Sequence, residues 1–154
     1  MSDELSFTDS AGDFTEARAG ELNAELVRRV RAFNFQRVGE YRFEPLSAVA
    51  HDAAGELVGG AGGTIGLRWL HVDVMWIAEA QRGRDLGSRL LARLEAMAIA
   101  RGARNAHVET TSFQALDFYR KRGYEVFGQL EDFPEGHTYY YLKKTLVAAD
   151  RSPA

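Results

Sequence analysis

An arginine-rich turn over residues 81–89 has the residue types and spacing that phosphate binding requires. The segment reads Gln-Arg-Gly-Arg-Asp-Leu-Gly-Ser-Arg and opens directly into a helix with apolar periodicity. The first turn of a helix carries backbone N–H groups without an internal partner, and the peptide dipoles add partial positive charge there. Gly83 and Gly87 let a ligand approach the backbone closely, and the three arginines supply forked donors for phosphate oxygens. The turn therefore predicts a pyrophosphate site, although such a turn also occurs in α/β proteins that bind no phosphate.

The elements on either side would position this turn at the edge of a sheet. Residues 70–77 alternate between apolar and polar side chains, which predicts a strand. Residues 86–100 carry an apolar stripe at helical spacing, and Gly102 follows, which predicts a helix and its end. A strand, a glycine-bearing turn and a helix in this order are typical of proteins that bind nucleotide ligands.

The rest of the chain completes a mixed α/β sheet, with the element order β-α-β-β-β-α-β-α-β-β. A first helix is expected over about 15–35 with a strand before it, and Ser112 is expected to cap a helix over 112–122. The other expected strands cover 43–50, 56–67, 106–111, 124–130 and 138–146. The unit 70–111 should be a parallel, right-handed crossover, with the arginine-rich turn at the carboxyl end of a central strand.

The composition narrows the class of protein. The 154 residues are 45% hydrophobic, which suits a single domain over 1–147 with a polar tail over 148–154. The net charge of -3 argues against nucleic-acid binding, and the lack of cysteine excludes disulfides, thiolate zinc sites and a cysteine nucleophile. No apolar run is long enough to cross a bilayer and no secretory signal is visible, so we expect a soluble, cytoplasmic protein without a membrane partner.

Two motifs resemble those of the GCN5-related N-acetyltransferases (GNAT). The first, Arg-Gly-Arg-Asp-Leu-Gly over 82–87, is similar to the family's acetyl-CoA motif, Arg/Gln-x-x-Gly-x-Gly/Ala at the start of a helix. The second, over 112–124, has the family's polar residue, alanine, aromatic-tyrosine pair, glycine and aromatic in the same order. The resemblance covers nearly the whole chain and is greatest to a bacterial subgroup without a clearly assigned substrate. It implies the acyl-CoA N-acyltransferase fold, a mixed sheet of six to seven strands flanked by helices, and acetyl-CoA as co-substrate.

Asp85 departs from the family motif, which usually has its first glycine at this position. Asp tolerates left-handed backbone better than most residues, so the shape of the loop can survive. A carboxylate beside a pyrophosphate is unfavourable unless it turns away or pairs with an arginine. We therefore expect residues 82–88 to wrap the pyrophosphate through backbone N–H groups, with the Asp85 carboxylate turned away.

The resemblance also implies which residues contact the cofactor. The pantetheine arm would lie along the strand that ends at Trp76 and Ile77, and a backbone N–H near Ile77 would polarise the thioester carbonyl. Arg82 and Arg84 would add side-chain contacts to the pyrophosphate. The expected cofactor contacts are Trp76, Ile77, Arg82, Gly83, Arg84, Asp85, Leu86, Gly87, Ser88, Ser112, Phe118 and Tyr119.

Four side chains are candidates for proton transfer, and three of them have a structural alternative. Tyr119 could protonate the coenzyme A thiolate, because a phenol with an ordinary pKa of about 10 stays protonated; the alternative is a core tyrosine. Asp73 and Glu109 compete as base toward the amine, and each could equally be an ordinary solvated or salt-bridged carboxylate. His71 is a further candidate base, and an amine that arrives neutral needs none.

His71 with Asp73, and His107 with Glu109, could also be read as a metal cluster on neighbouring strands. Alternation along each strand accounts for this spacing by itself and acyl transfer needs no metal, so we expect none. For substrate recognition we consider residues at the end of the first helix and on the faces of the strands. Aromatic side chains with acidic neighbours would suit a cationic amine there, although core packing is the alternative for most of these residues. The candidates are Asn34, Phe35, Tyr41, Trp69, Trp76 and Phe113.

The sequence leaves three functions open. The first is transfer of an acetyl group from acetyl-CoA to a primary amine of a small molecule or peptide, by direct attack in a ternary complex. The second is a non-catalytic acyl-CoA-binding regulatory module, which Asp85 would favour. The third is a different nucleotide-binding enzyme, although the turn is neither a P-loop nor a full dinucleotide motif. The two-stranded region 124–146 could pair across a homodimer.

Overall fold

The computed structural model describes residues 16–147, and for residues 16–19 only the backbone. The chain divides into two compact units, Met1–Tyr41 and Arg42–Ala154. The first contains the helix α1 (Glu16–Val38), which confirms the expected N-terminal helix. The strand expected before this helix and the expected tail lie outside the described residues. Among the helices that the structure describes, none combines the length and the apolar character that a bilayer crossing needs.

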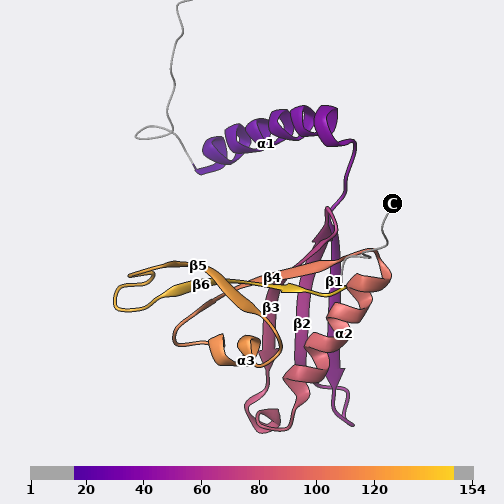
Figure 1. Cartoon of the computed structure of the whole chain (residues 1–154), viewed down its shortest axis with the longest axis vertical. Coiled ribbons are helices and arrows are strands. Elements are labelled where there is room, and N and C mark those ends of the chain that lie inside the picture. Colours follow the sequence, from indigo (N-terminus) through magenta and orange to yellow (C-terminus); the bar gives the residue numbers. More distant parts are fainter. Residues whose placement is uncertain (1–15, 148–154) are drawn as a thin grey trace, which may run out of the picture. The chain divides into compact units, whose positions relative to one another are not determined.

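The second unit is built on a mixed sheet of six strands in the order β1-β2-β3-β4-β6-β5 (Figure 1). Strands β1, β2 and β3 form consecutive antiparallel pairs, β3 pairs with β4 in parallel, and β6 lies between β4 and β5. This arrangement confirms the mixed α/β sheet expected from the sequence. The strands are β1 (Glu44–His51), β2 (Leu57–Gly66), β3 (Trp69–Ile77), β4 (Asn105–Thr111), β5 (Glu125–Leu130) and β6 (Tyr139–Thr145).

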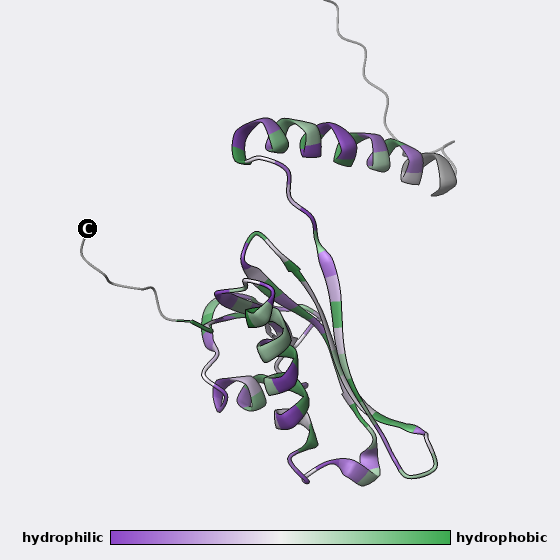
Figure 2. Ribbon diagram, turned by 90° about the vertical axis from the view of Figure 1, so that its right-hand side faces the viewer, coloured by the Kyte–Doolittle hydropathy of each residue, from purple (hydrophilic) through white to green (hydrophobic). Residues whose placement is uncertain are grey.

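The helix α2 (Leu86–Ala100) connects β3 to β4 and packs against β1, β2 and β3. Its apolar stripe recurs every three or four residues, so one side of the helix is buried against the sheet while the other side stays in water. The buried members of the stripe are Leu90, Leu91, Leu94 and Ala98. Figure 2 shows α2 beside the sheet, with apolar residues interleaved among polar ones along it. Burial of this stripe fixes where α2 begins, and therefore where the arginine-rich turn lies.

The helix expected over 112–122 is shorter in the structure. The helix α3 (Leu116–Arg120) has Ala115 as its N-cap, so the expected cap at Ser112 was wrong. The Ser112 hydroxyl instead accepts a hydrogen bond from the backbone N–H of Thr138, at 3.2 Å. This long-range contact with the start of β6 competes with local capping, and the local sequence contains no sign of it.

β3 and β4 separate because β3 carries a β-bulge. Their parallel pairing joins Trp69–Val72 to Asn105–Val108 and stops there. On the other side of β3, the register with β2 shifts between Gly62 and Gly63, which leaves Asp73 as the additional residue of the bulge. A bulge bends its strand and increases the local twist. Beyond this point β3 turns away from β4, and the two strands run apart in Figure 1.

We expect Gly63→Ala to damage the bulge, because a Cβ at Gly63 would lie 2.4 Å from the carbonyl oxygen of His71. The backbone would have to shift, which should lower the free energy of unfolding in urea by about 1–3 kcal/mol. Gly60→Ala on the same strand is the matched control, because its Cβ would meet Val49 at 3.4 Å. Equal stability of the two variants would contradict this role of Gly63.

Candidate active site

A cleft of about 830 Å³ lies where β3 and β4 separate. Its walls are residues 72–77 of β3, residues 108–110 of β4, and residues 112–119, which lead into α3 and form most of it. Pockets that bind small molecules usually enclose about 300–1,000 Å³. The bulge in β3 therefore opens a space large enough for a small ligand, which we call the β3–β4 cleft.

A second pocket, of about 450 Å³, lies at the start of α2. It shares several lining residues with the β3–β4 cleft, so a single extended ligand can occupy both. We call it the phosphate-turn pocket, because it brings together most of the residues expected to contact a pyrophosphate. Its lining residues are Ile77, Gln81, Arg82, Gly83, Asp85, Leu86, Gly87, Ser88, Phe118 and Arg122.

The turn itself is held by two residues with left-handed backbone. Asp85 is the N-cap of α2 with φ of 61°, and Gly83 has φ of 72°. The structure thus gives Asp85 the left-handed conformation that a glycine would adopt more easily. The Asp85 carboxylate makes no capping hydrogen bond to the helix, so the N–H groups of the first turn are not satisfied by it.

Arg122 is a cation of this pocket that the sequence did not single out. Its Nη1 donates to the Phe118 carbonyl oxygen at 2.7 Å, and its Nε donates to the Ser88 hydroxyl at 3.0 Å. The guanidinium carbon also lies 3.7 Å from the centroid of the Phe118 ring. Arg122 follows α3, and Ser88 lies in the first turn of α2, so only the folded chain brings them together.

Arg82 links the turn to the end of β3. Its Nε donates a hydrogen bond to the carbonyl oxygen of Ile77 at 3.2 Å, and its side chain lines both pockets. Arg82 and Arg122 therefore supply the positive charge of the phosphate-turn pocket. Arg84 lines neither pocket, and its expected contact with the pyrophosphate stays a prediction.

Gly87 lets the two motifs of the sequence touch. A Cβ at this position would lie 3.2 Å from Cε2 of Phe118, which is tighter than an ordinary contact. The missing side chain allows the first turn of α2 to approach α3, so Gly87 serves the packing of protein against protein. From the sequence we expected Gly87 to let a ligand approach the backbone. Gly87 also lines both pockets, so that role stays a prediction.

The outer edge of β3 has backbone groups that face the β3–β4 cleft. The Ala78 N–H donates to the Val58 carbonyl oxygen at 2.9 Å. This bond identifies which residues at the end of β3 are hydrogen-bonded to β2: Ala78 and, by alternation, Trp76 and Val74. In an antiparallel ladder, residues alternate between those that bond to the partner strand and those that point away from it. The N–H and C=O groups of Met75 and Ile77 therefore point away from β2, into the space that β4 has left.

Tyr119 lies in α3, is almost fully buried and lines the β3–β4 cleft. Its ring packs edge-on against Phe118 and Tyr124, with centroids 5.1 Å and 5.5 Å away. Burial raises the pKa of Tyr119 to about 12, because the phenolate would lose its hydration. The residue thus combines the two alternatives considered for it, a packed ring and a protonated hydroxyl group beside a cleft.

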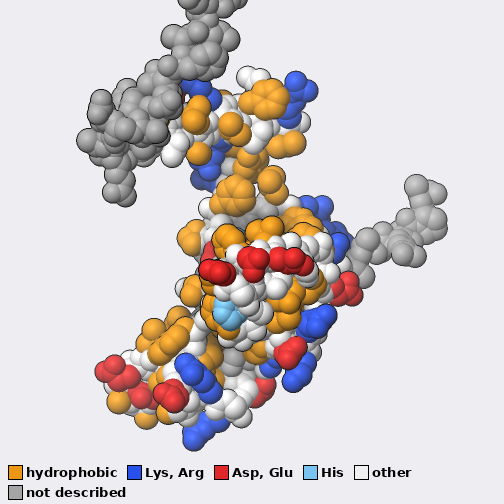
Figure 3. Space-filling model, turned by 90° about the vertical axis from the view of Figure 1, so that its left-hand side faces the viewer, with side chains coloured by type: hydrophobic (Ala, Val, Ile, Leu, Met, Phe, Trp, Pro, Cys, Tyr) orange, Lys and Arg blue, Asp and Glu red, His pale blue; other side chains and the backbone are white. Residues whose placement is uncertain are grey.

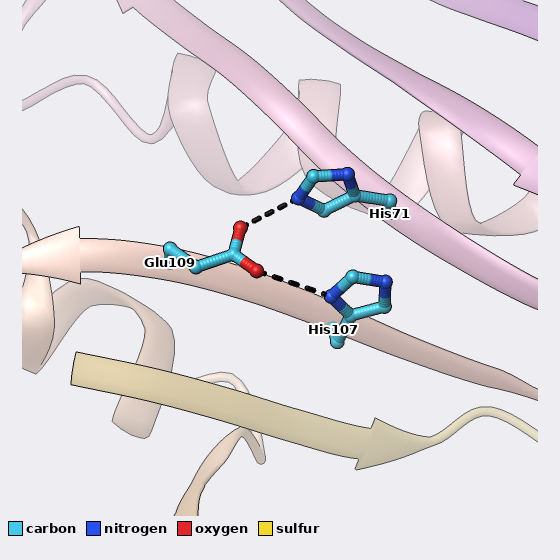
Figure 4. Close-up of side chains that lie close together, drawn as sticks. All are labelled: His71, His107 and Glu109. Carbon is cyan, nitrogen blue, oxygen red and sulfur yellow. Dashed lines mark hydrogen bonds and ion pairs between the residues drawn. The ribbon is translucent and has the colours of Figure 1, made fainter. Parts of the chain in front are cut away.

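Two histidines and two carboxylates meet across β3 and β4 beside the cleft, and Figure 4 shows three of them, His71, His107 and Glu109. We call His71, Asp73, His107 and Glu109 the histidine–carboxylate cluster. The Nε2 of His71 lies 2.5 Å from Oε2 of Glu109, and its Nδ1 lies 2.8 Å from Oδ1 of Asp73. Asp73 is held in turn by the Thr64 hydroxyl, which donates to it at 2.7 Å. Both expected base candidates therefore bind one imidazole.

His107 completes the histidine–carboxylate cluster from β4. It is the register partner of His71, and the two rings stack with centroids 4.3 Å apart. The Nδ1 of His107 lies 3.4 Å from Oε1 of Glu109. Burial, and next the neighbouring His71, lower the pKa of His107 below its usual value, which favours the neutral ring.

The remaining expected site residues fall into three groups. Trp76, Ser112 and Phe113 line the β3–β4 cleft. Trp69 contacts the His107 ring, with centroids 6.0 Å apart. The N-terminal unit holds Asn34, Phe35 and Tyr41, where Asn34 bonds to the Tyr41 hydroxyl and Phe35 packs on the Tyr41 ring; their role in substrate recognition stays a prediction.

Comparisons with known proteins agree with this geometry. The family model described as the acetyltransferase (GNAT) family matches residues 13–124. The chain is 40% identical over 131 residues to blasticidin-S acetyltransferase from Streptomyces morookaense, covering 84% of this chain and 96% of that protein.

Solved structures show the same fold. An acetyltransferase from Bacillus cereus superposes with a TM-score of 0.77 at 28% identity, covering 89% of this chain and 97% of that one. Nourseothricin acetyltransferase superposes with a TM-score of 0.59 at 25% identity, covering 66% of this chain and 65% of that one. Together with the two motifs and the cleft, these matches show that the chain belongs to the GNAT family of acetyltransferases and is an acyltransferase enzyme.

Proposed function

We propose that this enzyme transfers an acetyl group from acetyl-CoA to a primary amine of a small cationic molecule, by direct attack in a ternary complex. The observation that carries the proposal is the β3–β4 cleft, which is lined by the free edge of β3, a protonated Tyr119 and the Glu109 carboxylate. Acetyl transfer needs a polarised thioester, an acid for the leaving thiolate and a base for the amine. The name of the blasticidin-S acetyltransferase indicates a small-molecule substrate for that relative, which favours a small molecule over a peptide here.

The phosphate-turn pocket would bind the pyrophosphate of acetyl-CoA. The N–H groups at the start of α2 and the positive end of its dipole favour an anion there. Arg82 and Arg122 line the same pocket and carry guanidinium groups suited to phosphate oxygens. The bonds that Arg122 makes to the Ser88 hydroxyl hold its guanidinium ready beside this site.

The pantetheine arm would lie along the outer edge of β3. Its amides can pair with the N–H and C=O groups of Met75 and with the N–H of Ile77, as an added strand pairs with a sheet edge; the Ile77 carbonyl already accepts a bond from Arg82. The thioester would then lie near the end of β3, between Ile77 and Tyr119, which both line the cleft. Continuity between the two pockets lets one cofactor occupy both.

The reaction begins when the amine nitrogen attacks the thioester carbonyl carbon. A C–N bond forms, and the C=O electron pair moves onto the oxygen, where a backbone N–H at the end of β3 would stabilise the charge. Collapse of this intermediate breaks the C–S bond and expels the coenzyme A thiolate. The Tyr119 hydroxyl donates its proton to that thiolate and is reprotonated from solvent.

Glu109 would take the proton that the amine loses. Its carboxylate lines the cleft and its side chain is 22% exposed, whereas Asp73 is 40% exposed. A proton received by Glu109 can pass through His71 to Asp73, because both ring nitrogens of His71 already face a carboxylate oxygen. The histidine–carboxylate cluster thus connects a shielded base to solvent.

A cationic substrate fits the charge and the aromatic content of the part of the β3–β4 cleft that Asp73 and Glu109 line. Asp73 and Glu109 supply negative charge, and Trp76 and Phe113 supply aromatic faces that attract cations. Figure 3, viewed from the side toward which the β5–β6 hairpin points, shows several acidic side chains on that face of the molecule. Such a surface favours positively charged small molecules and disfavours nucleic acid.

Three further expectations from the sequence concern the alternative function, the oligomeric state and the location of the protein. The non-catalytic module was favoured by Asp85, which adopts the left-handed backbone that the turn needs but keeps a negative charge in the lining of the phosphate-turn pocket. A homodimer formed through residues 124–146 and a cytoplasmic location remain predictions. The apolar side chains exposed on the β5–β6 hairpin, Phe127, Leu130 and Phe133, are compatible with such a dimer.

Replacement of Asp85 should change cofactor affinity. We expect Asp85→Gly to tighten acetyl-CoA binding about 3- to 10-fold, because it removes a negative charge near the pyrophosphate and restores the residue best suited to left-handed backbone. Asp85→Asn removes the charge alone and should give an intermediate gain. Calorimetric titration measures all three affinities, and weaker binding by Asp85→Gly would contradict the proposed location of the pyrophosphate.

Tyr119→Phe should lower kcat about 100-fold while leaving acetyl-CoA affinity unchanged, because it removes only the proton for the leaving thiolate. Tyr124→Phe is the matched control: it loses a 2.9 Å bond to Glu95, so stability should fall while kcat persists. Thiol release with blasticidin S as the first acceptor measures kcat. Since the pKa of Tyr119 is about 12, the donating form persists at neutral and mildly alkaline pH, and wild-type kcat should not decline there. Full activity of Tyr119→Phe would refute the assignment.

Glu109→Gln should reduce kcat/KM about 100-fold at neutral pH, because the amide keeps the shape of the carboxylate but accepts no proton. The loss should shrink as pH rises and more of the amine arrives neutral. Glu125→Gln, an exposed position on β5, is the control and should match the wild type. A pH profile shared by Glu109→Gln and the wild type would show that Glu109 is not the base.

A further inference from the structure

We propose that His71, His107 and Glu109 form a binding site for a divalent transition-metal ion, with Zn²⁺ as its probe. From the sequence we considered a metal cluster at these residues and expected none, because alternation along each strand accounts for their spacing by itself. The structure adds the parallel register that places His71 directly beside His107, and the side-chain positions that direct both rings toward one carboxylate (Figure 4). The site shares Glu109 with the proposed mechanism of acetyl transfer, which itself uses no metal.

The three ligand atoms already lie close enough for coordination once their side chains rotate. One nitrogen from each histidine and a Glu109 carboxylate oxygen lie within 4.8 Å of one another. Bonds of about 2.0–2.1 Å in a tetrahedral site separate the ligand atoms by about 3.4 Å. The two rings are stacked at an interplanar angle of 6°, and a metal lies in the plane of each imidazole that binds it, so both rings must rotate about their side-chain bonds, together with Glu109, to meet one ion.

The cluster also has the second layer of contacts that metal sites require. A histidine that binds a metal through one nitrogen usually donates its other N–H to a carboxylate, which fixes the ring. His71 has this contact, because its Nδ1 lies 2.8 Å from Asp73, and Thr64 holds Asp73 in turn. His107 packs edge-on against Trp69, which restricts its ring as well. The ligands are therefore held close together before an ion arrives.

The donor set selects the kind of ion. Two imidazoles and one carboxylate suit Zn²⁺ and other late first-row ions, whereas Mg²⁺ and Ca²⁺ prefer oxygen ligands. Three protein ligands leave the fourth position of a tetrahedral ion open to water or to a substrate amine. An ion bound here would displace the close contact between His71 and Glu109 and withdraw Glu109 from proton transfer.

Calorimetry of the full, tag-free chain with zinc chloride tests the site directly. We expect one Zn²⁺ per chain, no comparable heat with magnesium chloride, and binding weakened at least about tenfold in His107→Gln. His51→Gln is the matched control. His51 is an exposed histidine at the end of β1 and lies outside the histidine–carboxylate cluster, so its replacement should leave binding unchanged. No binding to the wild-type chain, or equal binding by His107→Gln, would overturn the proposal.

A second readout follows the acetyl transfer itself and rests on the proposed function, whereas the calorimetry does not. Zn²⁺ should slow thiol release by the wild-type enzyme, and in His107→Gln the same Zn²⁺ concentration should no longer lower the rate below the variant's own rate without Zn²⁺. Inhibition that persists unchanged in His107→Gln would overturn the site. An enzyme inactive toward every amine would count against the proposed function and leave the calorimetric result standing.

Discussion

The β-bulge at Asp73 is the constraint on which the rest of this site depends. Two parallel strands that stayed paired over their whole length would use their backbone groups on each other and leave no space between them. Here the pairing of β3 with β4 ends at Val72 and Val108, and the cleft begins at that point. The same local distortion opens the cavity, leaves the backbone of Met75 and the N–H of Ile77 without a partner strand, and places Asp73 in the cavity lining.

Charge is divided between the two ends of the cavity opened by the bulge. Arg82 and Arg122 lie at the end formed by the start of α2, and Asp73 and Glu109 lie toward the point where the strands separate. An anionic cofactor and a cationic substrate would therefore enter from opposite electrostatic environments and meet near the end of β3. Tyr119, buried and protonated, lies on the wall between them.

The sequence predicted the elements well and their contacts incompletely. Alternation over 70–77 and the apolar stripe after Gly87 report local geometry, so β3 and α2 were predictable to within a residue or so. The cap at Ser112 was predicted wrongly, and Arg122 was missed, because both depend on partners distant in the sequence. The stacking of His71 on His107 depends on the register of two strands separated by a helix, which no local pattern encodes.

Amide hydrogen exchange at β3, measured with and without acetyl-CoA, tests this view of the cleft most directly. If the pantetheine arm pairs with the free edge of β3, the N–H groups of Met75 and Ile77 should exchange at least about tenfold more slowly in the complex. The N–H groups of Val74 and Trp76, which face β2, should change much less. Unchanged exchange at Met75 and Ile77 in a chain saturated with acetyl-CoA would contradict the account.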